Sequence, residues 1–235
     1  MKSWHSLLAI LLLTLLGMAS SYSHIVSYWH GYLNTHALQY YHSNLIEMNL
    51  RRDLNVPNEA VLFYGDSLIQ GLAVQAASDK AVNYGIGHAT TAMVYQQIVK
   101  HKGLERASVV VISVGINDIL SGKVTDIIPK YRLILSNLPS DTNILIGLIQ
   151  PIDEDVLGRP GTSKIISDIN QGLILLCDSD QRVSCLSIAS LLTNEQGQLA
   201  SSYHIGDGLH LSSEANAIWL QQLQLTLLSF KSGNE

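Results

Sequence analysis

The sequence has a small share of charged residues and no basic cluster. Charged residues make up 14% of the 235 residues, whereas hydrophobic residues make up 47%; ordinary soluble domains have about 25% charged residues. A chain this apolar can bury a sizeable core, which excludes a disordered protein, and its length fits a single α/β domain. The formal net charge is −5 and basic residues form no long run, so we expect no nucleic-acid partner.

Cysteine is equally scarce. The only two cysteines, Cys177 and Cys185, cannot build a disulfide scaffold, a zinc ribbon or a C-x-x-C redox pair. We expect both to be small, buried, apolar residues. A single disulfide between them is the alternative, and it would require an oxidising compartment.

The amino-terminal region has no charged side chain between Lys2 and Glu47. Residues 7–19 form an apolar run that ends in small residues, which resembles a secretory signal peptide. Thirteen helical residues rise only about 20 Å, against about 30 Å of hydrocarbon. However, Trp4 and Trp29 flank a longer uncharged stretch, so an uncleaved anchor over residues 5–28 is the alternative. Residues 1–30 thus predict export to the periplasm or the exterior, with membrane association if the segment is retained.

Residues 31–57 are expected to form a linker and a helix over about residues 35–52. Histidines recur every six residues at His24, His30, His36 and His42. Six residues correspond to about 600° around a helix, so successive rings do not share a face, whereas helical metal sites place histidines at i and i+4. We therefore expect no metal site in this region.

From residue 58 to residue 235 the pattern predicts one α/β domain. Short apolar runs suited to buried parallel strands alternate with helical stretches, which indicates a doubly wound α/β/α sandwich. We expect Pro129 to be tolerated in the first turn of its helix, with Thr125 as the N-cap. The expected strands are 60–65, 81–86, 108–115, 143–149 and 183–188, and the expected helices are about 68–78, 90–101, 125–137, 162–177 and 212–229.

Sheets of this kind bind ligands beyond the carboxyl ends of their strands. Gly-Asp-Ser-Leu follows the first expected strand at 65–68, and a glycine-containing loop follows the second at 83–88. Gly-Ile-Asn-Asp follows the third at 115–118, and Asp-Gly-Leu-His at 207–210 precedes the last helix. The fold therefore predicts that a hydroxyl, an amide side chain, a carboxylate and an imidazole meet at one edge.

These groups match the needs of acyl transfer, which requires a nucleophile, a base, a group that orients the base, and donors for the oxyanion. We expect Ser67 to be the nucleophile, His210 the base and Asp207 the residue that orients His210. The Ser67 amide, the Asn117 side chain and an amide from the second strand's loop would form the oxyanion hole. His204 also lies three residues from Asp207 and is the alternative base.

At these residues the chain resembles the SGNH hydrolases, also called GDSL esterases and lipases. The resemblance covers about residues 58–230 and implies a flavodoxin-like three-layer sandwich with a five-stranded parallel sheet. It further implies a serine esterase mechanism without metal or cofactor. Ser67, Asn117, Asp207 and His210 then have the roles given above, and the substrate is a small-molecule, glycan or lipid ester.

The second block departs from the family pattern. Relatives have Asn-x-Gly-x-x-Gly-Asp, where the last glycine supplies an oxyanion amide, whereas this chain has His88 and Ala89 at the final two positions. A backbone amide comes from any residue, so His88 could donate if it tolerates the glycine conformation, and Gly87 is the alternative donor.

The leading hypothesis from the sequence is an exported serine esterase that acts on carboxylic esters through an acyl-enzyme. The same site could instead transfer the acyl group to a sugar hydroxyl, as an envelope glycan O-acetyltransferase. Because the second block is altered, a non-catalytic binding module that keeps the cleft is a third hypothesis. The sequence does not specify acyl chain length, alcohol or oligomeric state.

Overall fold

The computed structural model describes residues 26, 27, 31, 33 and 35–232. The predicted signal peptide or anchor lies outside the described residues, apart from residues 26 and 27. The chain divides into two compact units, Met1–Glu47 and Met48–Glu235. Within the described residues, no helix combines the length and the apolar character needed to cross a bilayer.

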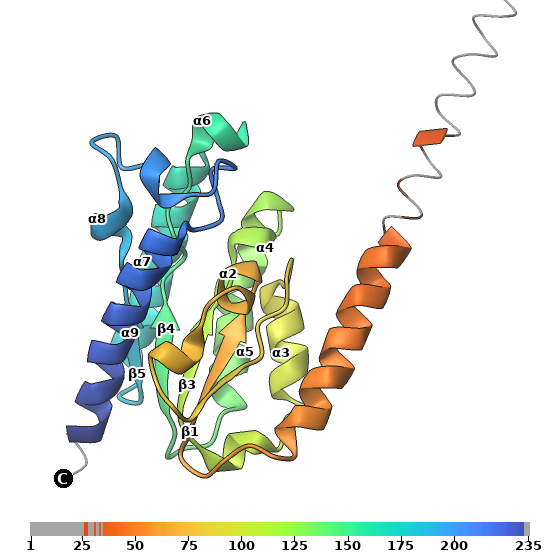
Figure 1. The fold of residues 1–235 in the computed structure, drawn as a ribbon, viewed down its shortest axis with the longest axis vertical. Helices are drawn as coiled ribbons and strands as arrows, with labels where there is room; N and C mark the ends of the chain where they lie inside the picture. The colour runs from red at the N-terminus through yellow and green to blue at the C-terminus, as the bar shows by residue number, and fades with distance from the viewer. Residues whose placement is uncertain (1–25, 28–30, 32, 34, 233–235) are drawn as a thin grey trace, which may run out of the picture. The chain divides into compact units, whose positions relative to one another are not determined.

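The second unit is built around a five-stranded parallel sheet (Figure 1). Its strand order is β2-β1-β3-β4-β5, the order of flavodoxin-like sheets, which confirms the predicted fold class. Both faces of the central strands are buried, in agreement with their nearly continuous runs of Val, Ile and Leu. The strands are β1 (Ala60–Gly65), β2 (Ala81–Asn83), β3 (Ala107–Ser113), β4 (Asn143–Gly147) and β5 (Val183–Leu186).

Helices cover both faces of this sheet. Residues 35–53 are helical and lead from the first unit into the second. The α-helices that follow are α2 (Ser67–Gln70), α3 (Thr91–Ile98), α4 (Ile116–Leu120), α5 (Ile127–Ser136), α6 (Glu154–Leu157), α7 (Thr162–Ser179), α8 (Ala189–Leu192) and α9 (Ser213–Ser232). The short 3-10 helices are η1 (Val74–Ala76), η2 (Gly103–Arg106), η3 (Val124–Asp126) and η4 (Ser201–Tyr203).

The side chains of β1 point alternately to the two faces of the sheet, and each face is covered by its own layer of the core. Leu62 and Tyr64 point to the layer covered by α3, α5 and α7, whereas Val61 and Phe63 point to the layer covered by α9, α8 and η1. Figure 1 shows α9 and α3 on opposite sides of the strands. Successive side chains of a strand point to opposite faces, so a central strand must be apolar at every position.

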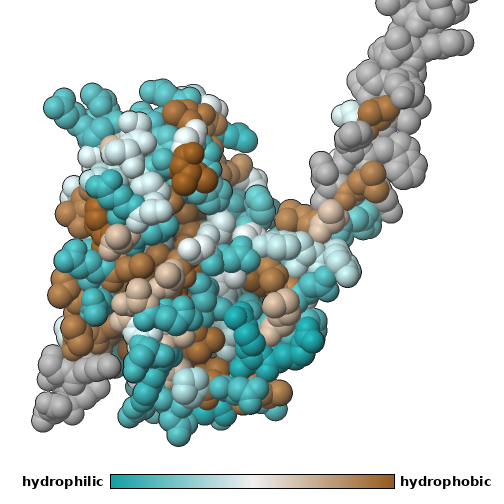
Figure 2. Space-filling view, in the orientation of Figure 1, coloured by the Kyte–Doolittle hydropathy of each residue, from teal (hydrophilic) through white to brown (hydrophobic). Residues whose placement is uncertain are grey.

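Apolar side chains also reach the surface of this unit. Figure 2 shows them over α9, interspersed with hydrophilic ones, and Leu225 and Leu228 are among those exposed there. Isolated exposed leucines are normal on soluble domains, because polar atoms are too few to cover the whole surface. These residues therefore do not by themselves mark a binding face.

One expected helix is divided in the structure, and the expected N-cap of another is displaced. The expected helix 68–78 is divided into α2 and η1, since the Asn83 side chain donates to the carbonyls of Ile69 (2.7 Å) and Leu72 (3.1 Å) where α2 ends. Pro129 does lie in the first turn of α5, as predicted. The assignment of Thr125 as N-cap was wrong, because Thr125 lies within η3 and Asp126 precedes α5.

The second unit includes residues from Met48 onward, whereas the sequence pattern predicted an α/β domain from residue 58. Asp53 explains the difference: it is buried, and its carboxylate accepts hydrogen bonds from the amides of Lys102 (2.7 Å) and Gly103 (2.8 Å). Asn49 is also buried and donates to the Tyr84 carbonyl at 3.2 Å. The last turns of the helix over residues 35–53 are therefore part of the unit's core.

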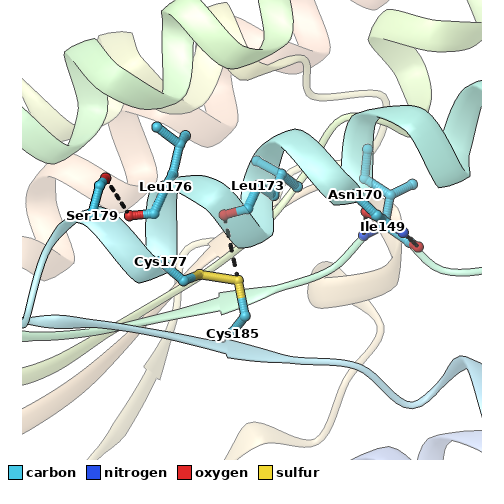
Figure 3. Close-up of a disulfide and its surroundings, with 7 residues drawn as sticks. All are labelled: Ile149, Asn170, Leu173, Leu176, Cys177, Ser179 and Cys185. Carbon is cyan, nitrogen blue, oxygen red and sulfur yellow. Dashed lines mark hydrogen bonds between the residues drawn. A yellow bond between two sulfur atoms is a disulfide. The ribbon is translucent and has the colours of Figure 1, made fainter.

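The two cysteines form a disulfide, which contradicts the expectation that they are unpaired apolar residues. Cys177 lies in the last turn of α7 and Cys185 in β5, with their Cα atoms 5.9 Å apart (Figure 3). This separation falls within the usual range for disulfides. Residues 180–182 connect α7 to β5 and bring the end of α7 over β5. Composition alone does not reveal that the two cysteines come together in this way.

Candidate active site

Ser67 is placed at the carboxyl end of β1 by a sharp turn into α2. Asp66 is the N-cap of α2, and its side chain accepts a hydrogen bond from the Leu68 amide at 3.0 Å. Gly65 allows close packing at the turn, because a Cβ at this position would lie 2.3 Å from the carbonyl oxygen of Ser113. Ser67 is thereby held at the carboxyl edge of the sheet, half-buried, with its amide in the unpaired first turn of a helix.

The structure brings Ser67, His210 and Asp207 together in one hydrogen-bonded series. Ser67 Oγ lies 2.9 Å from His210 Nε2, and His210 Nδ1 lies 2.6 Å from Asp207 Oδ2. The side chains of His210 and Asp207 are 39% and 42% exposed, so a solute can reach the serine–histidine pair. This is the arrangement in which an imidazole takes the serine proton while a carboxylate fixes its tautomer.

Asp207 also organises its own turn. Its Oδ1 accepts hydrogen bonds from the amides of Leu209 (3.0 Å) and His210 (2.9 Å). Burial acts to raise the pKa of Asp207, but the hydrogen bonds from the His210 ring and from these two amides outweigh it and hold the pKa below its usual value of 3.8. The carboxylate therefore stays ionised at neutral pH and can stabilise a protonated imidazole.

The Asn117 side chain lies close to the second loop. Its Nδ2 donates to the Ala89 carbonyl at 3.0 Å, and the amide group carries a second hydrogen. The neighbouring Asp118 accepts hydrogen bonds from the Thr91 amide (2.9 Å) and hydroxyl (2.8 Å). The Asn-Asp pair thus joins α4 to the start of α3 and sets the distance between two expected oxyanion donors.

His88 and Gly87 occupy different positions in this loop. His88 has a φ of 60°, a left-handed conformation that favours glycine, and its side chain is exposed. The Gly87 amide donates to Gln70 Oε1 at 2.9 Å. Of the two expected donors, Gly87 is thus already engaged by a side chain of the protein.

Two buried carboxylates beside the site have shifted pKa values. Burial raises the pKa of Asp66 to about 7, and it raises the pKa of Asp118 above its usual value despite the hydrogen bonds from Thr91. The sequence pattern assigned neither residue a role. The signal available in the sequence was their position next to Ser67 and Asn117, at the ends of strands that are buried on both faces.

The ring nitrogens of His204, the alternative base, are not hydrogen-bonded to Ser67. It is buried, and its Nδ1 accepts hydrogen bonds from the amides of Gly206 (3.0 Å) and Gly208 (3.2 Å). Among the residues that the structure describes, no group of three or more His, Cys, Asp or Glu side chains is placed to hold a metal ion.

Fold and site define an α/β/α protein with a hydrogen-bonded serine, histidine and aspartate at the carboxyl edge of a parallel sheet. The chain belongs to the GDSL-like lipase/acylhydrolase family, whose sequence profile matches residues 63–218. The predicted resemblance is thus confirmed. Family membership supports an acylhydrolase or esterase in general terms, without specifying the substrate.

Several solved structures share this fold. A Streptococcus pneumoniae protein provisionally described as a platelet activating factor has 22% identity and a TM-score of 0.72, over 84% of this chain and 96% of that one. An acetyl xylan esterase has 16% identity and a TM-score of 0.60, over 71% and 98%. The catalytic domain of the S. pneumoniae peptidoglycan O-acetyltransferase A has 17% identity and a TM-score of 0.59, over 75% and 96%. These likenesses establish a common fold. No curated protein matches the chain.

Proposed function

We propose that this protein is a serine esterase that hydrolyses carboxylic esters through an acyl-enzyme. The observation that carries the proposal is the series Ser67 Oγ, His210 Nε2, His210 Nδ1, Asp207 Oδ2, with separations of 2.9 and 2.6 Å. Ser67 Oγ attacks the ester carbonyl carbon as its proton passes to His210 Nε2. Asp207 stabilises the resulting imidazolium, which then protonates the leaving alcohol. A water molecule, activated by the same imidazole, releases the acid and restores Ser67.

The oxyanion of each tetrahedral intermediate needs preorganised donors. The Ser67 amide and the second hydrogen of Asn117 Nδ2 are two of them in our proposal. We assign the third to the His88 amide, because the Gly87 amide is engaged by Gln70. The φ of 60° at His88 supports this choice, since this left-handed conformation is one that glycine, the residue of the family pattern at this position, adopts freely.

A panel of esters from acetyl to long acyl chains, together with acetylated glycans, tests the proposal. Wild-type protein should hydrolyse part of the panel and react with a fluorophosphonate probe, and Ser67→Ala should lose both properties. Ser136→Ala, at an exposed serine in α5, is the matched control and should retain both. Hydrolysis that persists in Ser67→Ala would contradict the nucleophile assignment, and folded wild-type protein that neither reacts nor hydrolyses would favour a binding module.

Acyl transfer to a sugar hydroxyl is the second candidate. It is supported by the common fold with a domain described as a peptidoglycan O-acetyltransferase. The two functions differ only in which nucleophile resolves the acyl-enzyme. Product analysis with an acetyl donor and a glycan acceptor separates them: an esterase yields free acetate at the same rate with or without acceptor, whereas a transferase yields acetylated glycan.

We further propose that the protein is exported through residues 1–30, to the periplasm or the exterior, with the membrane as a partner if the segment is retained. The Cys177–Cys185 disulfide supports this proposal, because disulfides persist in oxidising compartments and are rare in the cytosol. Mass spectrometry of the protein recovered from cells tests it. A mature chain that starts after the apolar run and carries oxidised cysteines is expected, and free thiols in protein recovered from the cytosol would contradict it.

A further inference from the structure

We propose that His204 is a positioning residue that holds the backbone on both sides of Asp207 and thereby keeps the catalytic histidine in register with Ser67. This inference rests on the proposed serine esterase function. It assigns a role to a buried histidine that the reaction itself does not use.

The tautomer of His204 follows from its partners. Its Nδ1 lies 3.0 Å from the Gly206 amide nitrogen and 3.2 Å from that of Gly208. Backbone amides can only donate, so Nδ1 carries no proton and acts as the acceptor for both. A neutral ring then has its proton on Nε2, which lies 3.4 Å from Asp153 Oδ2. His204 is thus fixed as an acceptor toward the catalytic loop, whereas its buried Nε2 makes no hydrogen bond.

The loop over residues 204–211 depends on side chains for its shape. The Ile205 amide closes its base by donating to the His210 carbonyl at 3.0 Å. Inside the loop, two side chains accept from four amides: His204 from Gly206 and Gly208, and Asp207 from Leu209 and His210. The φ values of Gly206 (102°) and Gly208 (75°) exclude a regular helix or strand here. These amides therefore rely on His204 and Asp207 where a regular element would supply carbonyls.

His204 is itself held in place from the far side. Its side chain is 4% exposed, although the neighbouring Ile205 and Gly206 are exposed. The Asp153 amide donates to the Gly208 carbonyl at 2.8 Å, and a Cβ at position 208 would lie 2.7 Å from the Asp153 carbonyl oxygen. The segment before α6 is thus packed directly against the catalytic loop, and His204 lies between the two.

The position of Asp207 matters because its contact with His210 is short. Asp207 Oδ2 and His210 Nδ1 are 2.6 Å apart, and both residues flanking Asp207 are bound to His204. A displacement of about 1 Å in a catalytic group can cost about 100-fold in rate. Loss of the His204 acceptor should therefore slow the chemical step without removing any group that contacts substrate.

Three substitutions at position 204 test the acceptor role. Asn places an oxygen where His carries Nδ1, Gln places one near the position of Nε2, and Ala provides neither. We expect His204→Ala and His204→Gln to lower kcat by about 10- to 100-fold with little change in KM. His204→Asn should restore most of kcat. Asp153→Asn, which keeps an oxygen to cap α6, should leave kcat near the wild-type value.

Each outcome bears on the proposal. Equal kcat in all three His204 variants, whether low or unchanged, would overturn the acceptor role. A loss in Asp153→Asn as large as in His204→Ala would assign the effect to the Asp153 charge. Melting temperatures separate positioning from folding, because the proposal requires His204→Gln to be slower than His204→Asn at equal stability. Amide exchange provides an activity-free readout: Gly206 and Gly208 should lose protection in His204→Gln and keep it in His204→Asn.

The fluorophosphonate probe distinguishes failure of this inference from failure of the proposed function. It reports the reactivity of Ser67 without an ester substrate, and labelling rates should follow the order wild type, Asn, then Gln and Ala. Wild-type protein that is labelled but hydrolyses no ester would count against the esterase alone. Normal labelling of every His204 variant would overturn the positioning role alone. An unreactive wild-type protein would overturn both.

Discussion

Asp66 and Ser67 are adjacent in the chain but have opposite surroundings. Ser67 is half-buried at the edge of the sheet, whereas Asp66 is 2% exposed and caps α2 from within the core. Burial raises the pKa of Asp66 from its usual 3.8 to about 7. The turn that presents the nucleophile therefore contains a carboxyl group that the fold prefers in its protonated form.

This preference predicts a pH effect on stability. Because the pKa of Asp66 is higher in the folded protein, its stabilising contribution is complete below about pH 4 and is lost as the pH rises through about 7. Asp66→Asn keeps the capping oxygen and cannot ionise. Relative to wild type, the variant should gain up to about 4 kcal/mol in unfolding free energy between about pH 4 and pH 8, since one pKa unit is worth about 1.4 kcal/mol. Urea denaturation at both pH values measures this change.

Asp79→Asn is the matched control, because Asp79 is an exposed aspartate. Its stability relative to wild type should not vary with pH. A constant difference between Asp66→Asn and wild type across the same range would show that Asp66 does not titrate as its burial requires.

The Asn117 side chain has two roles in our proposal: it donates to the oxyanion, and it holds the Ala89 carbonyl. Asn117→Ala removes the proposed oxyanion donor and should lower kcat by about 10² to 10³. It also removes the bond to the Ala89 carbonyl. Thr91→Val is the control, since it removes another hydrogen bond between the start of α3 and α4, the 2.8 Å bond from the Thr91 hydroxyl to Asp118. That variant should lose about 1–2 kcal/mol of stability with kcat nearly unchanged. Comparable kcat values for the two variants would remove Asn117 from the oxyanion hole.

The elements themselves show what a sequence can and cannot specify. All five strands were predictable. The three central strands are buried on both faces and are therefore nearly apolar throughout, and the edge strands β2 and β5 are short, partly buried runs. Their ends were not: β2 stops at Asn83, although Tyr84 and Ile86 beyond it are also fully buried. Those side chains fill the core from a loop, and apolarity alone does not distinguish a buried loop from a strand. The division of the 68–78 stretch into α2 and η1 likewise depends on Asn83, a residue distant in sequence.

The disulfide that joins α7 to β5 should contribute to the stability of the folded protein. Cys177 and Cys185 are eight positions apart. Closing a loop of this size lowers the entropy of the unfolded chain by an amount worth about 2–3 kcal/mol at 25 °C. The double variant Cys177→Ala/Cys185→Ala should therefore be less stable by about this amount in urea denaturation. Reductant should destabilise wild-type protein similarly and leave the double variant unchanged, and an effect of reductant on the double variant would exclude this explanation.

At the scale of the molecule, the hydrolase unit needs the end of its amino-terminal helix. A chain that starts at residue 48 retains Asn49 and Asp53, whereas one that starts at residue 58 leaves the Lys102 and Gly103 amides without their carboxylate partner. We expect the shorter chain to be less stable by at least about 3 kcal/mol, because buried donors that lose their partners are costly. Thermal unfolding of the two chains measures the difference. Equal melting temperatures would place the start of the unit after residue 57.

The candidate site was partly predictable because two short motifs follow strand ends that meet at one edge, and a third precedes the last helix. The structure brings Ser67, Asp207 and His210 together and places Asn117 beside the second loop. Two features were beyond the sequence: the engagement of the Gly87 amide by Gln70, and the role of His204 as an acceptor for amides of its own loop. Both depend on which hydrogen bonds form in three dimensions, and residue spacing does not encode that choice.

Ser67 and His210 are separated by 143 positions and come from opposite ends of the hydrolase unit. A nascent polypeptide therefore has no activated hydroxyl until its final segments have emerged and docked. Partly synthesised chains would therefore not attack esters around them. The nucleophile and its base therefore come together only when the chain is complete. Proteolysis that removes the carboxyl-terminal quarter of the chain would remove the base and inactivate the protein.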